Sequence, residues 1–363
     1  MPCLLPHIPL APDINRILDV LRRRPVQGPV PLFELMVDQV FVEAMLGEPL
    51  VAAGLQGDDA FWAFHRNAIL FWHGMGYDYY FVRGDFGWPL RHTASAQDTA
   101  SISKGQRAWV QQECGVITNR DELSRYPWPV SVTPDAYDFI PRLAEMLPSG
   151  MGLAFRASGV LENLMWLMGY EGSSFALADD PGLFAEVAAR VGSRALELFA
   201  AALRHPQIRF VLLGDDLGFK TQTLLPPAVL RQHIFPWQKK LVDLAHSHNA
   251  PFVLHACGAL HAIMDDLIDN VGIDAKHSYE DAIEPVAQAK KKYGHRIAIL
   301  GGVDVDKLAR WEEAPLRQYV RDILAACVPG GGYALGSGNS IANYVSTRNY
   351  LAMLDEGRRW NNA

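Results

Sequence analysis

Residues Pro181–Arg204 read PGLFAEVAARVGSRALELFAAALR, and Ile208–Leu213 follow closely with IRFVLL. In the first segment apolar residues recur every three or four positions. Its proline suits a first helical turn, and Asp179 and Asp180 stand before it as caps, so the pattern predicts a helix. The second segment is a short apolar run, typical of a buried strand. Together they form the repeat unit of an α/β protein with a parallel sheet.

The same alternation extends along most of the chain. Eight short runs are predicted as strands: Val30–Met36, Tyr77–Val82, Met151–Phe155, Ile208–Leu213, Phe252–His255, Ile273–Lys276, Ile297–Leu300 and Tyr333–Leu335. Other helical patterns cover Pro227–His248, Ile263–Asn270, Ala282–Tyr293 and Pro315–Cys327. Eight repeats predict one (β/α)8 TIM barrel over residues 1–363. An open Rossmann sheet would want an early Gly-x-Gly-x-x-Gly turn, and none follows the first strands.

One irregular segment interrupts the alternation after the second predicted strand. Residues 85–150 are rich in Pro, Thr, Ser and Trp. We expect an insertion within the barrel here, with the role of a lid.

Composition excludes several classes of protein. The chain has 33 Lys and Arg against 40 Asp and Glu, a net charge of −7, which argues against a nucleic-acid partner. No apolar run is long enough for a transmembrane helix, and the N-terminal residues lack the features of a signal peptide. Four cysteines in a chain of this length do not form a disulfide framework. We expect a cytoplasmic enzyme with a small-molecule substrate and no membrane association.

The chemistry of a TIM barrel lies at the carboxyl ends of its strands. Polar side chains end every predicted strand: Glu34, Arg83, Asp85, Arg156, Asp215, Asp216, His255, Cys257, Lys276, His277, Glu280, Asp304, Ser337 and Asn339. Any one of them could be a helix cap or part of a loop ion pair, the reading we favour for Arg83, Asp85 or Glu280 taken singly. Because all eight strands deliver such groups to one rim, we expect an active site there.

His255 and Cys257 are the sharpest signal at this rim. Residues two apart on a strand point to the same side, so imidazole and thiolate could converge on one zinc ion. A buried thiol beside a structural histidine explains the pair equally well. A third zinc ligand would come from Glu34, Asp215, Asp216 or Asn339, and a carboxylate suits zinc better than an amide.

Other rim residues suggest acid–base and binding roles. The Asp215-Asp216 pair could supply a general base, a cation ligand or a helix cap. His277 could donate a proton, because the ordinary pKa of histidine lies near neutrality. Several aromatic residues belong to the core by default, yet could line an apolar cavity for a flat ligand: Trp72, Tyr79, Tyr80, Trp88 and Trp166.

Five stretches in this order resemble the uroporphyrinogen decarboxylase superfamily. They are Gly214–Gly218 (GDDLG), the prolines of Leu225–Pro236, Leu254–Gly258 (LHACG), Gly301–Asp304 (GGVD) and Gly331–Ile341 (GGYALGSGNSI). The resemblance extends from about Pro31 to Glu356 and implies the (β/α)8 barrel predicted above, with a homodimer as the expected assembly.

Two branches of the superfamily make different demands on the sequence. The resemblance to true uroporphyrinogen decarboxylases implies an arginine-rich loop after strand one and a histidine in the last-strand loop. Here the first place is Phe33–Asp38, which reads FELMVD, and the second falls on Asn339. Both departures make the chain more similar to the methyltransferase branch.

The methyltransferase branch implies zinc bound by a His-x-Cys pair and a distant Cys, a thiol substrate such as coenzyme M, and a corrinoid protein as partner. The pair is His255 and Cys257, and the distant Cys falls on Asn339. We therefore expect an enzyme that moves a methyl group from a methylated, for example methoxylated, small molecule to a corrinoid protein or thiol acceptor. Its expected catalytic residues are Glu34, Asp216 and His277, and its expected substrate-binding residues are Arg83, Arg156, Asp215, Asp304 and Asn339.

Two other functions stay open from the sequence. One is a cofactor-free decarboxylase of a tetrapyrrole or other polycarboxylate, with the carboxylates held by Arg83, Arg91 and Arg156. The other is a non-catalytic carrier of a corrinoid or porphyrin. An arginine-lined pocket would favour decarboxylation, and an acidic, aromatic pocket would favour methyl transfer.

Overall fold

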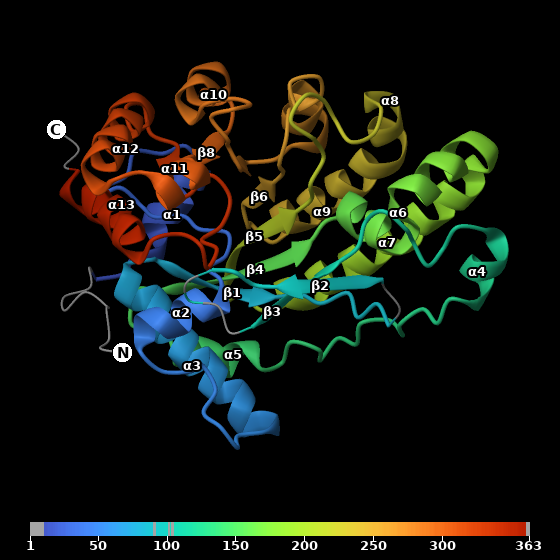
Figure 1. The fold of residues 1–363 in the computed structure, drawn as a ribbon, viewed down its shortest axis with the longest axis horizontal. Helices are drawn as coiled ribbons and strands as arrows, with labels where there is room; N and C mark the ends of the chain where they lie inside the picture. The colour runs from blue at the N-terminus through green and yellow to red at the C-terminus, as the bar shows by residue number, and fades with distance from the viewer. Residues whose placement is uncertain (1–10, 90–91, 101, 103–104, 361–363) are drawn as a thin grey trace.

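A parallel sheet of seven strands lies at the centre of the computed structural model, which describes residues 11–89, 92–100, 102 and 105–360 (Figure 1). The sheet order is β1-β4-β5-β6-β7-β8-β9, so the seven strands occur across the sheet in the same order as along the chain. Their bounds are β1 Tyr79–Arg83, β4 Gly152–Ser158, β5 Ile208–Gly214, β6 Phe252–His255, β7 Ala275–His277, β8 Ala298–Leu300 and β9 Tyr333–Ala334. This arrangement is TIM-barrel-like, and it confirms seven of the eight predicted strands.

The first predicted strand, Val30–Met36, does not join the sheet as a strand. It makes an isolated parallel bridge to Leu335, beside β9. On its other side the Tyr79 hydroxyl of β1 accepts a hydrogen bond from the Glu34 amide (2.8 Å) and donates one to the Glu34 carbonyl (3.0 Å). The prediction of a strand at Val30–Met36 is therefore wrong, because the Tyr79 hydroxyl, and not the backbone of β1, forms the hydrogen bonds to the backbone of Glu34. Pro31 also has no N–H to extend a backbone ladder.

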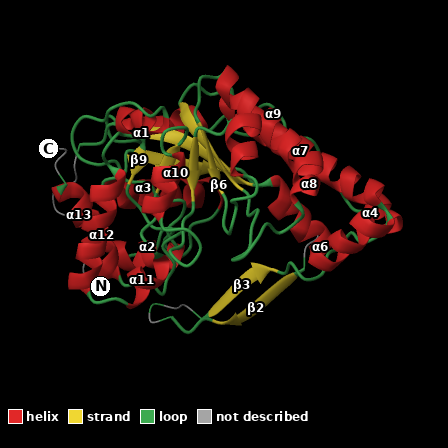
Figure 2. Cartoon of the chain, turned by 90° about the horizontal axis from the view of Figure 1, so that it is seen from above, coloured by secondary structure: helices red, strands yellow, loops and turns green. Residues whose placement is uncertain are grey.

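Helices surround the central sheet (Figure 2). The predicted helix at Pro181 is confirmed as α7, capped by Asp180, whose carboxylate accepts from the Leu183 amide at 3.0 Å. The predicted helix Pro227–His248 is divided into three consecutive segments, α8, η1 and α9. The helices are α1 Ile14–Leu21, α2 Gln39–Leu46, α3 Gly57–Met75, α4 Arg120–Arg125, α5 Ile140–Glu145, α6 Val160–Asp179, α7 Pro181–Leu203, α8 Pro227–Val229, η1 Leu230–Ile234, α9 Phe235–Ser247, η2 Asp266–Val271, α10 Val286–Tyr293, α11 Val305–Arg310, α12 Glu313–Cys327 and α13 Thr347–Arg359.

Residues between β1 and β4 contain a separate antiparallel hairpin, β2 (Thr93–Gln97) and β3 (Gln106–Val110), apart from the central sheet (Figure 2). The segment that follows contacts α6 where that helix is kinked at Gly169, which has a positive φ of 69°. At this kink the Leu167 carbonyl accepts hydrogen bonds from the amides of Val116 (2.8 Å) and Ile117 (2.9 Å). The segment is thus anchored on α6. Its role as a lid stays a prediction.

Aromatic packing fixes the strands that carry the site. The ring of Phe199 on α7 lies 5.1 Å from that of Phe155 on β4 and 6.3 Å from that of Phe252 on β6. All three side chains are fully buried. This helix therefore holds two strands of the sheet in place. In the described part of the chain, no helix combines the length and apolarity needed to cross a membrane.

Candidate metal centre and active-site cavity

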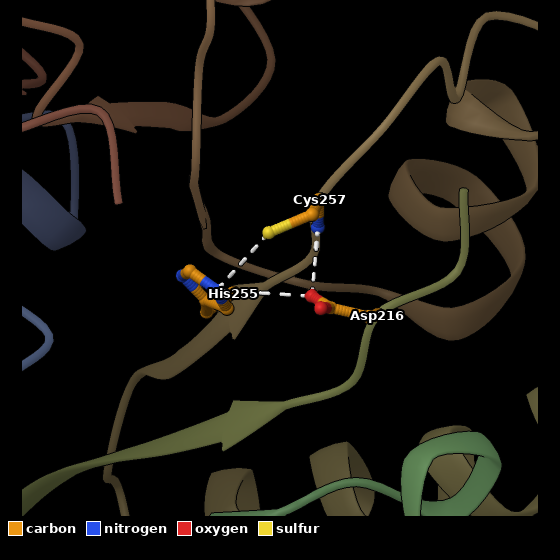
Figure 3. A group of neighbouring side chains, drawn as sticks. All are labelled: Asp216, His255 and Cys257. Carbon is orange, nitrogen blue, oxygen red and sulfur yellow. Dashed lines mark hydrogen bonds and ion pairs between the residues drawn. The ribbon is translucent and has the colours of Figure 1, made fainter. Parts of the chain in front are cut away.

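Asp216, His255 and Cys257 converge at the carboxyl ends of β5 and β6 (Figure 3). His255 is the last residue of β6, and Asp216 lies two residues beyond β5. Backbone hydrogen bonds continue past both strands, from the Asp215 amide to the His255 carbonyl (2.8 Å) and from the Gly218 amide to the Cys257 carbonyl (3.1 Å). The Asp216 carboxylate also accepts from the Cys257 amide at 3.1 Å. The two loops are thereby held in register.

The three side chains present one nitrogen, one sulfur and one oxygen to a common point. Their ligand atoms all lie within 4.8 Å of one another. His255 Nε2 is 3.5 Å from Cys257 Sγ and 3.8 Å from Asp216 Oδ1. Tetrahedral zinc with bonds of about 2.0–2.3 Å needs ligand atoms separated by roughly 3.5 Å. The set therefore fits a zinc site with three protein ligands and one open position, and of the four candidates considered from the sequence Asp216 is the one in this cluster.

The Cys257 thiol lies between polar neighbours. Asn339 Nδ2 is 3.2 Å from its sulfur, and Ser278 Oγ is 3.6 Å away. Burial raises the pKa of the Cys257 thiol, and the nearby Asp216 charge raises it further. A bound cation would oppose both effects, because a coordinating thiol loses its proton.

On the side away from Cys257 and Asp216, the His255 ring contacts a second buried histidine, His277. Its Nδ1 atom lies 2.8 Å from Nδ1 of His277, and His277 Nε2 lies 3.1 Å from the Ser337 carbonyl. Burial, together with the charges of Lys276 and Arg156, lowers the pKa of His255 to about 3. The pKa of His277 is lowered well below its ordinary value, mainly by burial. Burial thus favours the neutral form of both imidazoles.

A cavity of about 320 Å³ opens beside this cluster. Its lining is mixed in character: Leu35, Met36, Arg83, Arg156, Ala157, Ser158, Glu162, Trp166, Leu212, Gly214, Asp216, His255, Cys257, Asn339 and Ser340. Six of the residues predicted for the site meet here, namely Arg83, Arg156, Asp216, His255, Cys257 and Asn339. The lining is neither purely arginine-rich, as expected for a decarboxylase, nor purely acidic and aromatic, as expected for a methyltransferase. It holds two arginines, two carboxylates and one large aromatic ring.

Arg83 and Arg156 form a pair of like charges on one side of the cavity. They are register partners at the ends of β1 and β4. Among the described residues, neither guanidinium makes an ion pair with a carboxylate, whereas the Arg156 guanidinium lies 5.8 Å from the Phe81 ring centroid. Burial and the charge of Arg83 lower the pKa of Arg156 to about 10. Two adjacent cations without an anion make this side of the cavity suitable for an anionic ligand group.

Glu162 is a cavity residue that the sequence interpretation missed. It lies in the first turn of α6, four residues beyond the end of β4. Burial, followed by the charges of Asp216 and Asp215, raises its pKa to about 8. Extending the search for polar residues from the strand ends into the first turn of each following helix would have found it.

Four predicted site residues do not line the cavity. Glu34 is fully buried and hydrogen-bonds both the amide and the hydroxyl of Ser337. Asp215 accepts from the amides of Val160 and Glu162 at the start of α6 and from the Gln238 side chain, so it is a cap.

The other two lie close by. Asp304 caps α11 and lines a neighbouring cavity of about 770 Å³, to which Asn339 also contributes. His277 is buried behind His255. The predicted catalytic and binding roles of Glu34, Asp215, Asp304 and His277 stay predictions.

The aromatic residues considered for the cavity are mostly core residues. Trp72, Tyr79, Tyr80 and Trp88 are buried in the hydrophobic core, and of the five only Trp166 lines the cavity. Arg91, considered as a carboxylate ligand, lies outside the described residues.

Comparison with known proteins agrees with this architecture. The family model described as uroporphyrinogen decarboxylase (URO-D) matches residues 116–360, more than half of the chain. The chain therefore belongs to the URO-D family.

Two relatives are methyltransferases of methanogens. The methylcobamide:CoM methyltransferase MtaA of Methanosarcina barkeri is 27% identical over 158 residues, which cover 41% of this chain and 43% of that protein. The chain thus matches less than half the length of this curated relative. A methyltransferase from Methanosarcina mazei superposes with a TM-score of 0.63 at 16% identity, covering 94% of this chain and 97% of that one. This second likeness establishes the shared fold.

Proposed function

We propose that this protein is a methyltransferase that moves a methyl group between a small molecule and a corrinoid protein or thiol acceptor. The observation that carries the proposal is the cluster of Asp216, His255 and Cys257, whose ligand atoms lie within 4.8 Å of one another beside the cavity. The name of the M. barkeri relative, a methylcobamide:CoM methyltransferase, supports this reaction class.

The three residues would hold a zinc ion, with the fourth position open toward the substrate. Bound zinc would keep a substrate thiol at the open position deprotonated near neutral pH, and so supply a sulfur nucleophile. The chain contributes two anionic ligands, Asp216 and Cys257, and one neutral ligand, His255. Asn339 Nδ2 supports the arrangement as a hydrogen-bond donor to the Cys257 sulfur.

Other lining residues supply binding and proton transfer. The guanidinium groups of Arg83 and Arg156 would hold an anionic group of the small molecule. Burial raises the pKa of Glu162, which favours a protonated carboxyl group that could deliver its proton to an oxygen that loses its methyl group. Trp166 offers an aromatic surface for a flat substrate.

The test is methyl transfer with zinc-loaded protein in both directions. Methylcobalamin as donor is combined with coenzyme M, the thiol named in the relative, and methoxylated aromatic compounds as donors are combined with reduced cobalamin. Loss of the methylcobalamin spectrum with formation of the thioether supports the proposal. Cys257→Ser should abolish the reaction, whereas Cys114→Ser, at an exposed cysteine, should not. No transfer in either direction would refute the proposal.

A cofactor-free decarboxylase is the second candidate, and the unpaired Arg83–Arg156 pair favours it. In that case the protein would release carbon dioxide from a polycarboxylate, such as a uroporphyrinogen, after treatment with a chelator. Cys257→Ser would leave this activity intact and Arg156→Gln would reduce it. Cys257→Ser therefore separates the two functions, because it should abolish methyl transfer and leave decarboxylation intact.

A further inference from the structure

Two buried histidines face each other behind the candidate metal centre. His255 and His277 are register partners on β6 and β7, and their Nδ1 atoms are 2.8 Å apart. A contact this short requires a hydrogen bond, so one of the two Nδ1 atoms carries a proton and the other accepts it. Which atom carries the proton decides the state of His255 Nε2, the atom that faces Cys257 and Asp216.

The hydrogen-bond partner of His277 Nε2 decides which of the two Nδ1 atoms carries the proton. His277 Nε2 lies 3.1 Å from the Ser337 backbone carbonyl, which can only accept a hydrogen bond. His277 Nε2 therefore carries a proton. In a neutral ring the other nitrogen then has a free lone pair, so His277 Nδ1 accepts from His255 Nδ1. His255 Nε2 is left without a proton and is directed at the cluster.

The Ser337 carbonyl is itself fixed in position. The Glu34 carboxyl group binds both the amide and the hydroxyl of Ser337, and the Gly302 amide donates to the same carbonyl at 3.1 Å. A Cβ atom on Gly301 would lie 2.2 Å from this oxygen and 2.8 Å from the His277 ring. The backbone is thus packed directly against the His277–Ser337 contact. A flipped His277 ring would place carbon atoms opposite both His255 Nδ1 and the Ser337 carbonyl and would lose both hydrogen bonds.

The surroundings of His277 agree with a neutral ring. The Phe33 ring packs on it with centroids 5.1 Å apart, and it is fully buried. In the described ranges, no carboxylate makes an ion pair with it. A cationic His277 would instead donate from Nδ1 and place a proton on His255 Nε2, toward the cluster, where no metal could then bind.

From this chain of hydrogen bonds we propose that His277 is a positioning residue that fixes the tautomer of His255 for metal binding. Glu34 and Ser337 hold His277 in turn. The proposal deepens the function above and rests on it for the metal, whereas the tautomer assignment concerns the chain alone. Histidine ligands of metals commonly donate their second N–H to a fixed acceptor, and loss of that acceptor weakens metal binding about 10- to 100-fold.

The test combines the zinc affinities of two variants with a measurement of the histidine tautomers in wild type. His277→Asn keeps an acceptor near the position of Nδ1, and His277→Leu removes it. Zinc affinity is measured by competition with a chromogenic chelator. Tautomers are read from nitrogen-15 NMR of histidine-labelled, metal-free wild type, with the two rings assigned through loss of their signals in His255→Asn and His277→Asn.

We expect His255 with its proton on Nδ1 and His277 with its proton on Nε2. Zinc affinity should fall about 10- to 100-fold in His277→Leu and stay within about threefold in His277→Asn. The opposite tautomer of His255, unchanged affinity in His277→Leu, or equal losses in both folded variants would overturn the proposal. Should His277→Leu not fold, the wild-type tautomers and His277→Asn still decide. A wild type that shows these tautomers but binds no zinc would refute the metal function and leave the tautomer assignment intact.

Discussion

Asn339 Nδ2 lies 3.2 Å from Cys257 Sγ, on the opposite loop of the candidate metal centre. An amide therefore occupies the place where the resemblance to the methyltransferase branch implies a third cysteine. In the proposed zinc site the oxygen ligand is instead Asp216, whose carboxylate lies 3.8 Å from His255 Nε2. The proposed third ligand thus stands at the end of β5, and the amide at position 339 gives the first prediction.

Asn339→Cys should strengthen zinc binding. The substitution adds a thiolate beside Cys257 and completes a four-ligand set, so we expect an increase in affinity of about tenfold or more, or ~1.4 kcal/mol. Asn339→Ser, which adds no thiol, is the matched control. Chelator competition under reducing conditions measures both, and equal affinities for the two variants would show that residue 339 does not reach the metal.

Asp215 and Asp216 should separate stability from metal binding. Asp215→Asn puts an amide group against donors at the start of α6 and should lower the free energy of unfolding by about 1–3 kcal/mol, with zinc binding retained. Asp216→Asn should reduce zinc affinity at least tenfold with little effect on stability, because this side chain is 47% exposed. Urea unfolding and zinc titration of both variants check the assignment, and exchanged phenotypes would contradict it.

Glu34 should make stability depend on pH. Burial raises its pKa from 4.5 to about 8, so in this range the folded chain keeps a proton that the unfolded chain releases. The free energy of unfolding therefore falls as the pH rises between these values, by at most about 1.4 kcal/mol per pH unit. Glu34→Gln lacks this contribution, so its stability relative to wild type should rise with pH. Urea unfolding near pH 5 and pH 8 tests this, and a constant difference between the two proteins would rule it out.

Arg156→Gln should weaken the binding of an anionic ligand without lowering the stability of the fold. An anionic thiol such as coenzyme M should bind at least tenfold more weakly, whereas 2-mercaptoethanol, which has no anionic group, should bind as before. The melting temperature should stay the same or rise, because the substitution removes a buried like charge next to Arg83. Equal losses for both thiols would mean that Arg156 does not recognise the anion.

The central sheet was largely predictable from sequence because its strands are short apolar runs between amphipathic helices. The failure at Val30–Met36 has a local cause that periodicity does not carry. The Tyr79 hydroxyl replaces the backbone of β1 as hydrogen-bond partner of Glu34. A side-chain contact between residues 45 positions apart leaves no signal in the apolar pattern of either segment.

The site was predictable in part. His255 and Cys257 share a direction because they are two residues apart, and this reasoning needs no tertiary structure. The choice between Asp215 and Asp216 could not be made from sequence, because the two carboxylates point to different partners across the loop. Asp215 turns to α6 and Asp216 to β6. Only the packing of α6 on the end of β5 decides which carboxylate is taken up as a cap.

The central claim is that Asp216, His255 and Cys257 bind one metal ion, and metal content tests it most directly. Protein purified without chelator is analysed for zinc per folded chain, beside Cys257→Ser and the matched control Cys114→Ser. We predict about one zinc per chain in wild type and in Cys114→Ser, and its loss in Cys257→Ser. Wild type that neither carries nor takes up zinc, or a Cys257→Ser protein that keeps it, would contradict the claim.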